Sequence, residues 1–508
     1  MPSALPASGE QPTPILERPR RLRSRRFSPG ELRRAALLLL GLALFLAVYL
    51  APPWADAVDP EGRHFALTRE GKATLALFLL AGVWWVFEVV PIGVTGVAVG
   101  LIQVLFAIRS PQTALGSFFD PAIWFIFATL ILGKSFSKTG LTQRVAYNIL
   151  ALAGDRTSMI YLGSFAMIAV LTLFMAHTAV AATIFPLLMA IHSLYQEDGQ
   201  STRFGKGLFI GMAFAAGGSS IVTYLSAARG IIAAGFFHGI AGREISFAEF
   251  SWYLLPVGWC MLVLLWLLVL VFFKPERKVI PSLKTRARDL ASRLGPVKRS
   301  EKLVLILALG VVALLILRSA VPWLQPLDRT GLLLTTTLLL FVFKVLSLQD
   351  LEDIPWNILL LFGGTMSLGL CLWQTGAAQW LAVRSLPLFQ HAPWFVFILC
   401  LGGLILVLTN LVVNVAVIAF VLPVGLLMAP YLGVTPEIVF FTTLVTAGMP
   451  FLLLVGAAPN AIAYESRQFT PAEFLKIGVP ASLILLAVWS LFVLFLWPLM
   501  GLPVLSSP

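Results

Sequence analysis

The sequence predicts an all-α polytopic membrane protein. Of its 508 residues, 59% are hydrophobic and only 12% are charged, and the mean hydropathy is +0.91. A soluble protein keeps roughly a quarter of its residues charged, so lipid is the main solvent of this chain. Its apolar stretches reach the length of about 20 residues at which a helix crosses a bilayer. They do not alternate as the strands of a membrane barrel do.

Two basic segments predict the orientation of the chain. The first 34 residues contain eight arginines, and Lys274–Lys302 contains ten Lys or Arg against three acids. Segments that stay in the cytoplasm carry such an excess. We therefore expect a basic cytoplasmic arm (1–34), a first transmembrane span with its outer loop (35–71) and a basic cytoplasmic linker (274–300), in a cell inner (plasma) membrane. Topology and contact with anionic lipid account for the net charge of +12 without nucleic-acid binding.

The apolar run 37–50 follows the basic arm as the core of a signal peptide would. No clear small-residue cleavage site follows it, so we expect an uncleaved span. The three cysteines lie in apolar stretches without metal spacing, and the five histidines form no cluster. We therefore expect no metal site and no cofactor. No nucleophile and base stand in a recognisable pattern, so an enzyme is not expected.

Four short blocks of the first half recur in the same order in the second half. The first pair lies 236 residues apart and the second pair 237, which makes coincidence improbable. The sequence therefore contains an internal duplication. The paired blocks are TGLTQRVA and TGAAQWLA (from 139 and 375), HTAVAATIFP and NVAVIAFVLP (from 177 and 414), AARGII and AAPNAI (from 227 and 457), and AEF (from 248 and 472).

This duplication predicts two inverted-topology repeats, residues 72–273 and 301–508, and about 11 transmembrane helices in total. One leading span and the spans of the first repeat return the chain to the cytoplasm at the linker. The second repeat then starts inside, and its odd number of spans leaves the C-terminus outside. Inverted repeats of this kind are typical of secondary transporters, which bind substrate between the copies near the bilayer midplane.

Each repeat interrupts its helical pattern with a polar tip inside an apolar stretch. The tips are Ala176-His177-Thr178 and Val413-Asn414-Val415. After them, short apolar helices are expected to end at Pro186 and Pro423. Helices this short do not cross a bilayer, so the pattern predicts two re-entrant hairpins.

A second interruption follows in each repeat, at 217–230 and 446–460, where Gly and Pro can unwind a helix. Non-helical backbone at membrane depth persists only where protein or a water-filled cavity satisfies it. The N-termini of half-helices also offer N–H groups and a positive dipole end to an anion. These features predict a binding site for an anion, with ordinary kinks and loops as the alternative.

Three long stretches resemble one transporter family. WWVFEVVPIGVTG (84–96) and SFFDPAIWFIFATLILGKSFSKTGL (117–141) resemble first-repeat segments of the divalent-anion/sodium symporter family, the carriers of dicarboxylates, citrate and sulfate. LSLQDLEDIPWNILLLFGG (346–364) resembles the counterpart in the second repeat. The resemblance extends from Trp84 to Pro480. It implies a homodimer in which each protomer has a scaffold domain and a transport domain that shifts like an elevator, carrying a small anionic substrate across the lipid bilayer.

The resemblance also implies positions for the site. In the family, each hairpin tip carries Ser-Asn-Thr, and each unwound span carries a Gly-Thr-Pro-Pro-Asn-like segment. Here the second unwound segment, 456–460, is close to that pattern, whereas the first, 226–230, has Arg229 and Gly230 in place of Pro and Asn. The implied substrate-binding positions are His177, Thr178, Arg229, Asn414, Val415, Ala458, Pro459 and Asn460. The implied cation-coupling positions are Thr172, Ala176, Gly218, Thr409, Asn414 and Gly456.

The departures fall on the site and leave the scaffold intact. The first tip keeps only Thr178 of the family motif and the second only Asn414, so oxygen ligands for sodium are missing, above all in the first copy. Arg229 and His177 are gained, and an ionisable group at membrane depth is a functional candidate. The alternatives are that Arg229 snorkels or pairs with a carboxylate such as Glu465, and that His177 is a neutral core residue. Sodium is therefore an uncertain coupling ion.

The leading hypothesis is a secondary transporter of di- or tricarboxylates, or of another divalent anion, that is sodium-independent or an exchanger. A membrane sensor or assembly partner that kept the fold without transporting is the second hypothesis. An ion antiporter of the same architecture is the third, but such proteins usually need a buried aspartate. The sequence has no aspartate in either tip or unwound segment.

Overall fold

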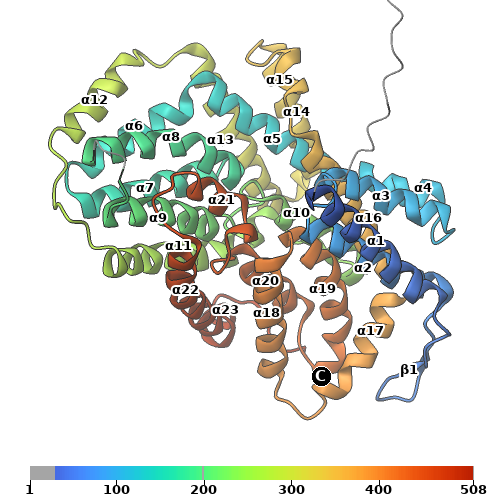
Figure 1. Cartoon of the computed structure of the whole chain (residues 1–508). Helices are drawn as coiled ribbons and strands as arrows, with labels where there is room; N and C mark the ends of the chain where they lie inside the picture. The colour runs from blue at the N-terminus through green and yellow to red at the C-terminus, as the bar shows by residue number, and fades with distance from the viewer. Residues whose placement is uncertain (1–28, 197–199, 507–508) are drawn as a thin grey trace, which may run out of the picture.

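The computed structural model describes residues 29–196 and 200–506 and is almost entirely helical (Figure 1). The all-α prediction is confirmed. Among the described residues, eight helices are long and apolar enough to cross a membrane, and six shorter apolar helices accompany them. The chain is a multi-pass membrane protein. Most of the predicted basic arm, residues 1–28, lies outside the described residues.

The described residues of the first half and the linker form twelve α-helices and one short antiparallel hairpin. The strands β1 (Ala57–Val58) and β2 (His64–Phe65) form that hairpin in the loop between α1 and α2. The helices are α1 (Pro29–Leu50), α2 (Arg69–Val86), α3 (Ile92–Leu105), α4 (Pro111–Gly116), α5 (Pro121–Thr139), α6 (Leu141–Ala153), α7 (Thr157–Thr172), α8 (His177–Tyr195), α9 (Arg203–Ser219), α10 (Ala228–Ala241), α11 (Phe247–Phe272) and, in the linker, α12 (Leu283–Arg293).

The second half begins with a long helix and ends in a broken one. Its helices are α13 (Arg299–Ala320), α14 (Arg329–Val342), α15 (Leu348–Glu352), α16 (Trp356–Gln374), α17 (Ala377–Ser385), α18 (Trp394–Leu411), α19 (Asn414–Met428), α20 (Pro436–Gly448), α21 (Ala458–Tyr464), α22 (Pro471–Leu491) and α23 (Trp497–Leu499). Single 3-10 turns are η1 (Ser117–Phe119), η2 (Pro322–Leu324), η3 (Leu386–Leu388), η4 (Pro430–Leu432) and η5 (Leu454–Gly456), and Phe492–Leu496 is a π-helical turn between α22 and α23.

Helices follow one another in the same order in the two halves, from α5 to α11 and from α16 to α22. In both halves a long helix ends at a glycine in the left-handed region, with a φ of 88° at Gly140 and of 74° at Gly376. Glycine adopts this φ without steric cost, which explains why the glycine recurs in the first pair of matched blocks. The chain then enters the shorter helix α6 or α17. The inverted orientation of the two copies stays a prediction.

α7 and α8 form a hairpin whose two outer ends meet the same segment of the linker. The Thr157 N–H at the start of α7 donates to the Lys278 carbonyl (3.0 Å), and the Arg277 N–H donates to the Tyr195 hydroxyl at the end of α8 (2.7 Å). α18 and α19 pack together as the corresponding hairpin, and α17, which leads into α18, also packs on α19. Each hairpin therefore returns to the end of the molecule at which it starts.

The predicted helix ends at Pro186 and Pro423 are wrong. α8 continues through Pro186 to Tyr195, and α19 continues through Pro423 to Met428. A proline inside a helix removes one N–H hydrogen bond, but packing against neighbouring helices compensates that loss in membrane proteins, and Leu188 just beyond Pro186 is fully buried. α8 is long enough to cross a membrane. Whether the α7–α8 hairpin is re-entrant therefore depends on the outer ends of its two helices, and both of these ends contact the linker.

Ion pairs stabilise the end of the molecule that holds the linker. Arg144 of α6 pairs with Glu301 of α13, with Nε 2.6 Å from Oε2 and only 14% and 3% of the two side chains exposed. Lys138 at the end of α5 pairs with Asp350 of α15. The C-terminus lies at the opposite end, near α17 (Figure 1).

Candidate functional site

The hairpin tips start their second helices without a side-chain cap. α8 begins at His177 after Ala176, and α19 begins at Asn414 after Val413. α10, which follows the first unwound segment, begins after Ala227 and also lacks a cap. Ala and Val cannot accept a hydrogen bond from the first helical turn, as Ser, Thr or Asp would. The N–H groups of these turns therefore depend on backbone or ligand acceptors.

The first hairpin tip packs against the first unwound segment. The His177 N–H donates to the Ser226 carbonyl (2.9 Å), and His177 Nδ1 lies 3.0 Å from the same oxygen. Because a carbonyl only accepts, Nδ1 carries a proton there, which leaves Nε2 as the acceptor of the neutral ring. The first tip thus presents Nε2 of a neutral imidazole as a hydrogen-bond acceptor.

A hydroxyl closes the end of α7. Ser226 Oγ donates to the Thr172 carbonyl (2.9 Å) and lies 2.9 Å from Thr223 Oγ1. Thr172 Oγ1 donates to the Ile168 carbonyl within its own helix (2.6 Å). Both oxygens of Thr172, a predicted cation-coupling position, are therefore already hydrogen-bonded inside the protein.

Arg229 is the charged residue of the first unwound segment, and it is only 4% exposed. Its Nη2 donates to the Ser220 hydroxyl and to the Gly448 carbonyl (3.3 Å), while its Nε has no partner. No carboxylate of the described residues forms an ion pair with it. Arg229 therefore neither reaches the surface nor pairs with Glu465, the two alternatives that the sequence left open.

The partners of Arg229 stand at the ends of two half-helices. Ser220 follows the last residue of α9, and Gly448 is the last residue of α20. The C-terminal end of a helix carries a partial negative charge and unpaired carbonyls. The guanidinium thus occupies a place between two helix ends where a cation is favoured.

The second hairpin tip meets the same end of α20. Asn414 Nδ2 donates to the Ala447 carbonyl (2.8 Å), and the next carbonyl along the chain, that of Gly448, accepts from Arg229. Two sequence-predicted residues from different halves, Asn414 and Arg229, are therefore brought together on adjacent carbonyls. His177 joins them through Ser226, three positions before Arg229.

Two buried amides stabilise the second unwound segment. Asn460 Nδ2 donates to the carbonyls of Pro450 (2.9 Å) and Leu453 (3.1 Å). Asn410 Oδ1, near the end of α18, accepts from the N–H groups of Leu452 (2.9 Å) and Leu453 (3.1 Å). Together they satisfy backbone groups that the helix break leaves free. Sequence reasoning missed Asn410, although an amide inside an otherwise apolar helix, one residue after Thr409, is costly unless it is paired.

Two glycines allow the close approaches around these breaks. A Cβ on Gly448 would stand 2.3 Å from Ile221 Cγ2 and 3.2 Å from Arg229 Nη2. A Cβ on Gly456 would stand 2.8 Å from Pro450 Cβ and 3.3 Å from the Thr409 carbonyl oxygen. Larger residues at either position would displace the neighbouring backbone or side chain.

Known proteins match this chain along nearly its whole length. A family model described as the sodium:sulfate symporter transmembrane region matches residues 35–502. The chain belongs to this family. Relatives include sodium-dependent dicarboxylate transporters named SdcS. That of Staphylococcus saprophyticus is 26% identical over 482 residues, covering 91% of this chain and 91% of that protein, and that of Staphylococcus aureus is 26% identical over 496 residues, covering 93% and 92%.

Solved transporter structures share the fold. The YdaH transporter of Alcanivorax borkumensis aligns with a TM-score of 0.54 at 15% identity, covering 93% of this chain and 98% of that one. MtrF of Neisseria gonorrhoeae, described with a class of antimetabolite efflux pumps, aligns with a TM-score of 0.56 at 15% identity, covering 93% and 97%. At this identity the similarity concerns the fold alone.

The other positions implied by membership of the sodium:sulfate symporter family surround the same breaks. Thr178 and Ala176 are partly exposed at the first tip, whereas Val415 and Pro459 are buried and Ala458 is exposed. Thr409 Oγ1 donates to the Ile405 carbonyl of its own helix (2.9 Å). Gly218 faces Leu262 of α11, whose side chain lies 3.6 Å from the place of a Cβ.

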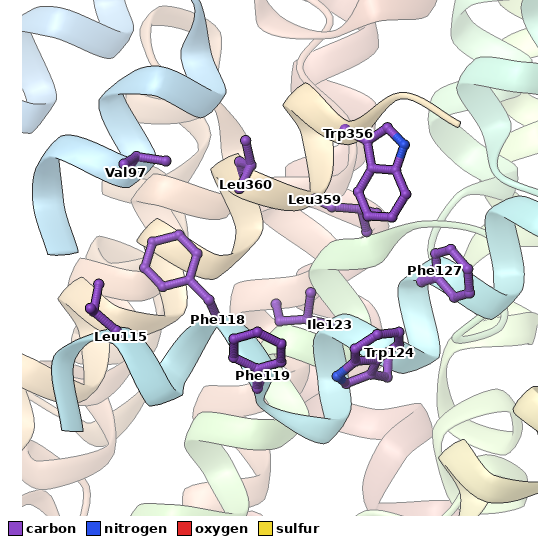
Figure 2. Close-up of a pocket in the computed structure, with 10 residues that line it drawn as sticks. All are labelled: Val97, Leu115, Phe118, Phe119, Ile123, Trp124, Phe127, Trp356, Leu359 and Leu360. Atoms are coloured by element: carbon purple, nitrogen blue, oxygen red, sulfur yellow. The ribbon is translucent and has the colours of Figure 1, made fainter. Parts of the chain in front are cut away.

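A separate cavity of about 420 Å³ lies between α3, α5 and α16 (Figure 2). Phe118, Phe119, Trp124 and Trp356 surround it, and all of its lining residues are apolar or aromatic. An anion placed there would lose its hydration without gaining a polar partner. This cavity is therefore not the anion site that the family implies.

Proposed function

We propose that this protein is a secondary transporter of di- or tricarboxylates, or of another divalent anion, that does not use sodium at its first cation position. The SdcS relatives are described as sodium-dependent dicarboxylate transporters, which supports the substrate class. The buried guanidinium of Arg229, which has no carboxylate partner among the described residues, carries the proposal.

A buried charge without a counter-charge is costly, because a low-dielectric site removes most of its hydration. A substrate carboxylate would supply the missing counter-charge. The planar guanidinium binds a carboxylate with two parallel hydrogen bonds, and Arg229 Nε has no other partner. The uncapped N-termini of α8, α10 and α19 add N–H donors and positive dipole ends near the same segments.

The first cation position has fewer side-chain oxygens than the family's motif supplies. The first tip has Ala176 and His177 in place of the family's Ser and Asn, and the Thr172 carbonyl already accepts from Ser226 Oγ. In the second half, the Thr409 carbonyl oxygen faces Gly456, which has no side chain to occupy it. We propose that Arg229 replaces a coupling cation in the first half, while the second half keeps more of the family's site.

A fixed charge cannot leave with the substrate, so a sodium gradient could not drive uptake through this position. Exchange of one anion for another, or proton coupling through His177 Nε2, would then be the modes of transport. We further propose that the two hairpins and the two broken spans move together against the remaining helices as an elevator, in a homodimer. Their mutual hydrogen bonds, from His177 to Ser226 and from Asn414 to Ala447, support such a unit.

The test is uptake by the full chain reconstituted in liposomes, with labelled succinate, citrate and sulfate as probes. Initial rates are compared in sodium and in choline buffer, with and without a pH gradient, and with the unlabelled anion inside. We expect equal rates in the two buffers and a faster rate with internal anion or an inward proton gradient. Uptake that collapses in choline overturns the sodium-independent proposal but keeps the transporter. Failure of every probe in every condition favours the non-transporting alternative.

A further inference from the structure

A groove of about 380 Å³ lies where the linker helix α12 packs against the first half. α6 and α8 form its floor with Leu150, Leu187 and Leu194, and α12 contributes Leu283 and Leu290. α12 lies at the periphery of the molecule and packs against α6 (Figure 1). The groove therefore has an apolar floor next to the part of α8 that follows Pro186. Its outer wall is the amphipathic helix α12.

The α12 wall combines apolar and basic residues on one helical face. Arg286 and Arg293 line the groove together with Leu283 and Leu290. Their spacing of three, four and seven residues puts them on the same side of the helix. Asp289 also lines the rim, so two guanidinium groups stand against one carboxylate.

Arg286 and Arg293 are exposed, and neither forms an ion pair or a side-chain hydrogen bond with the described residues. Lys284 and Arg288 lie on the same helix but do not line the groove. Two of the basic residues of α12, Arg286 and Arg293, therefore lie at the apolar groove, and Lys284 and Arg288 lie outside it. Charge next to an apolar channel is complementary to a molecule with an anionic head and hydrocarbon chains.

We propose that this groove binds one anionic phospholipid, with its acyl chain along α8 and its phosphate between Arg286 and Arg293. An amphipathic helix with basic residues on its polar face lies in the interfacial region of a bilayer. Basic pockets between membrane helices bind anionic headgroups there. The occupant is a lipid and not a soluble phosphate, because the floor of the groove is apolar and leads along a membrane helix.

The position of the groove gives the lipid an effect on the first hairpin. α8 carries the His177 tip at its other end, and α12 is tied to the start of α7 because the Lys284 N–H donates to Asp155 Oδ1 (2.7 Å). A lipid that contacts both α8 and α12 would hold the two arms of the hairpin against the linker. Its binding would therefore stabilise the folded protein independently of any transported anion.

The experiment measures lipid binding to the detergent-purified full chain by native mass spectrometry and by the shift in melting temperature. Phosphatidylglycerol, phosphatidylcholine and soluble glycerol phosphate are the probes. We expect phosphatidylglycerol to remain bound and to raise the melting temperature, phosphatidylcholine to bind more weakly, and glycerol phosphate to have no effect. In Arg286→Gln and Arg293→Gln the affinity for phosphatidylglycerol should fall about fivefold for each charge removed.

Two further variants separate the groove from general surface charge. Lys284→Gln with Arg288→Gln removes two charges from the same helix outside the groove and should keep the bound lipid. Ala190→Trp, which fills the groove but leaves every charge in place, should lose it. Equal losses in the two charge variants, binding of phosphatidylcholine as strong as that of phosphatidylglycerol, or undiminished lipid binding by the tryptophan variant would each overturn the proposal.

Discussion

The two unwound segments solve the same physical problem with different chemistry. A helix broken at membrane depth leaves carbonyl and N–H groups that lipid cannot satisfy. In the second half, the amides of Asn410 and Asn460 satisfy them. In the first half, hydroxyls do so: Ser220 Oγ donates to the Gly217 carbonyl, and Ser226 Oγ accepts from the Thr223 N–H (3.3 Å). The guanidinium of Arg229 donates to the Ser220 hydroxyl and to the Gly448 carbonyl of the second break. Neutral groups therefore satisfy backbone atoms in both breaks, but the first segment also supplies a permanent positive charge, whereas 446–460 contains no charged residue.

The matched blocks show where the halves diverged. Leu173 stands in the first half at the position of Asn410, and Gly230 stands at that of Asn460. Neither can replace an amide, so the first break relies on Ser226 instead. The two copies of an internal duplication can therefore keep the same backbone breaks while different side chains stabilise them. We expect residues of the first half to determine which ion is coupled to transport. We expect residues of the second half to determine the shape of the binding site.

The largest effect is expected from removing the charge of the first half. Arg229→Ala should weaken succinate or citrate binding by about 3 kcal/mol or more, because a buried dianion would lose its counter-charge. Asn414→Ala, the matched variant from the second tip, should cost only about 1–3 kcal/mol, the usual loss for one unsatisfied buried polar partner. Isothermal titration of the purified variants measures both values.

The order of the two effects is what the comparison predicts. Arg229→Lys keeps the charge without the planar fork, so its affinity should lie between that of the parent and that of Arg229→Ala. An Arg229→Ala protein that binds and transports like the parent would contradict the role of the guanidinium. An unchanged affinity in Asn414→Ala, with fold and oligomeric state intact, would remove Asn414 from the site.

A smaller effect is expected in the second half, and on stability. Asn410→Ala should lower the free energy of unfolding by about 1–3 kcal/mol, because the N–H groups of Leu452 and Leu453 lose their acceptor. Unfolding by SDS in mixed micelles measures the change. Gln349→Ala, which removes an exposed amide from α15, is the control and should leave the unfolding free energy unchanged. Equal stability of the two variants would show that the second break does not depend on this amide.

The sequence was sufficient for the fold class and for the location of both tips and both breaks. Hydrophobic length predicted the helices, and glycine and proline predicted the breaks at 217–230 and 446–460. It was not sufficient for the helix ends, since α8 passes through Pro186 and packing between helices decides whether a proline ends a membrane helix. It also missed Asn410, because only the folded chain brings Asn410 Oδ1 to the N–H groups of Leu452 and Leu453.

The smallest effect on binding and stability is expected from cysteine variants that report only the orientation of the two halves. The first hairpin is anchored at the linker, where the Thr157 N–H donates to the Lys278 carbonyl. The second hairpin ends near the C-terminus, where the Ser506 N–H donates to the Gly433 carbonyl (3.1 Å). The two anchors lie at opposite ends of the molecule (Figure 1). With the linker in the cytoplasm, we therefore expect the C-terminus outside.

Single cysteines at Ser292 and Ser506, in a chain whose three native cysteines are replaced, test this orientation without touching the site. A membrane-impermeant maleimide added to intact cells should label the Ser506→Cys protein and miss the Ser292→Cys protein until the cells are permeabilised, because basic segments stay in the cytoplasm. The reverse pattern would place the linker outside and the C-terminus in the cytoplasm. It would contradict the inference that the basic linker is cytoplasmic. Labelling of both positions from one side would be more damaging. It would place the anchors of both hairpins on the same face of the membrane. That result would contradict the inverted orientation of the two halves.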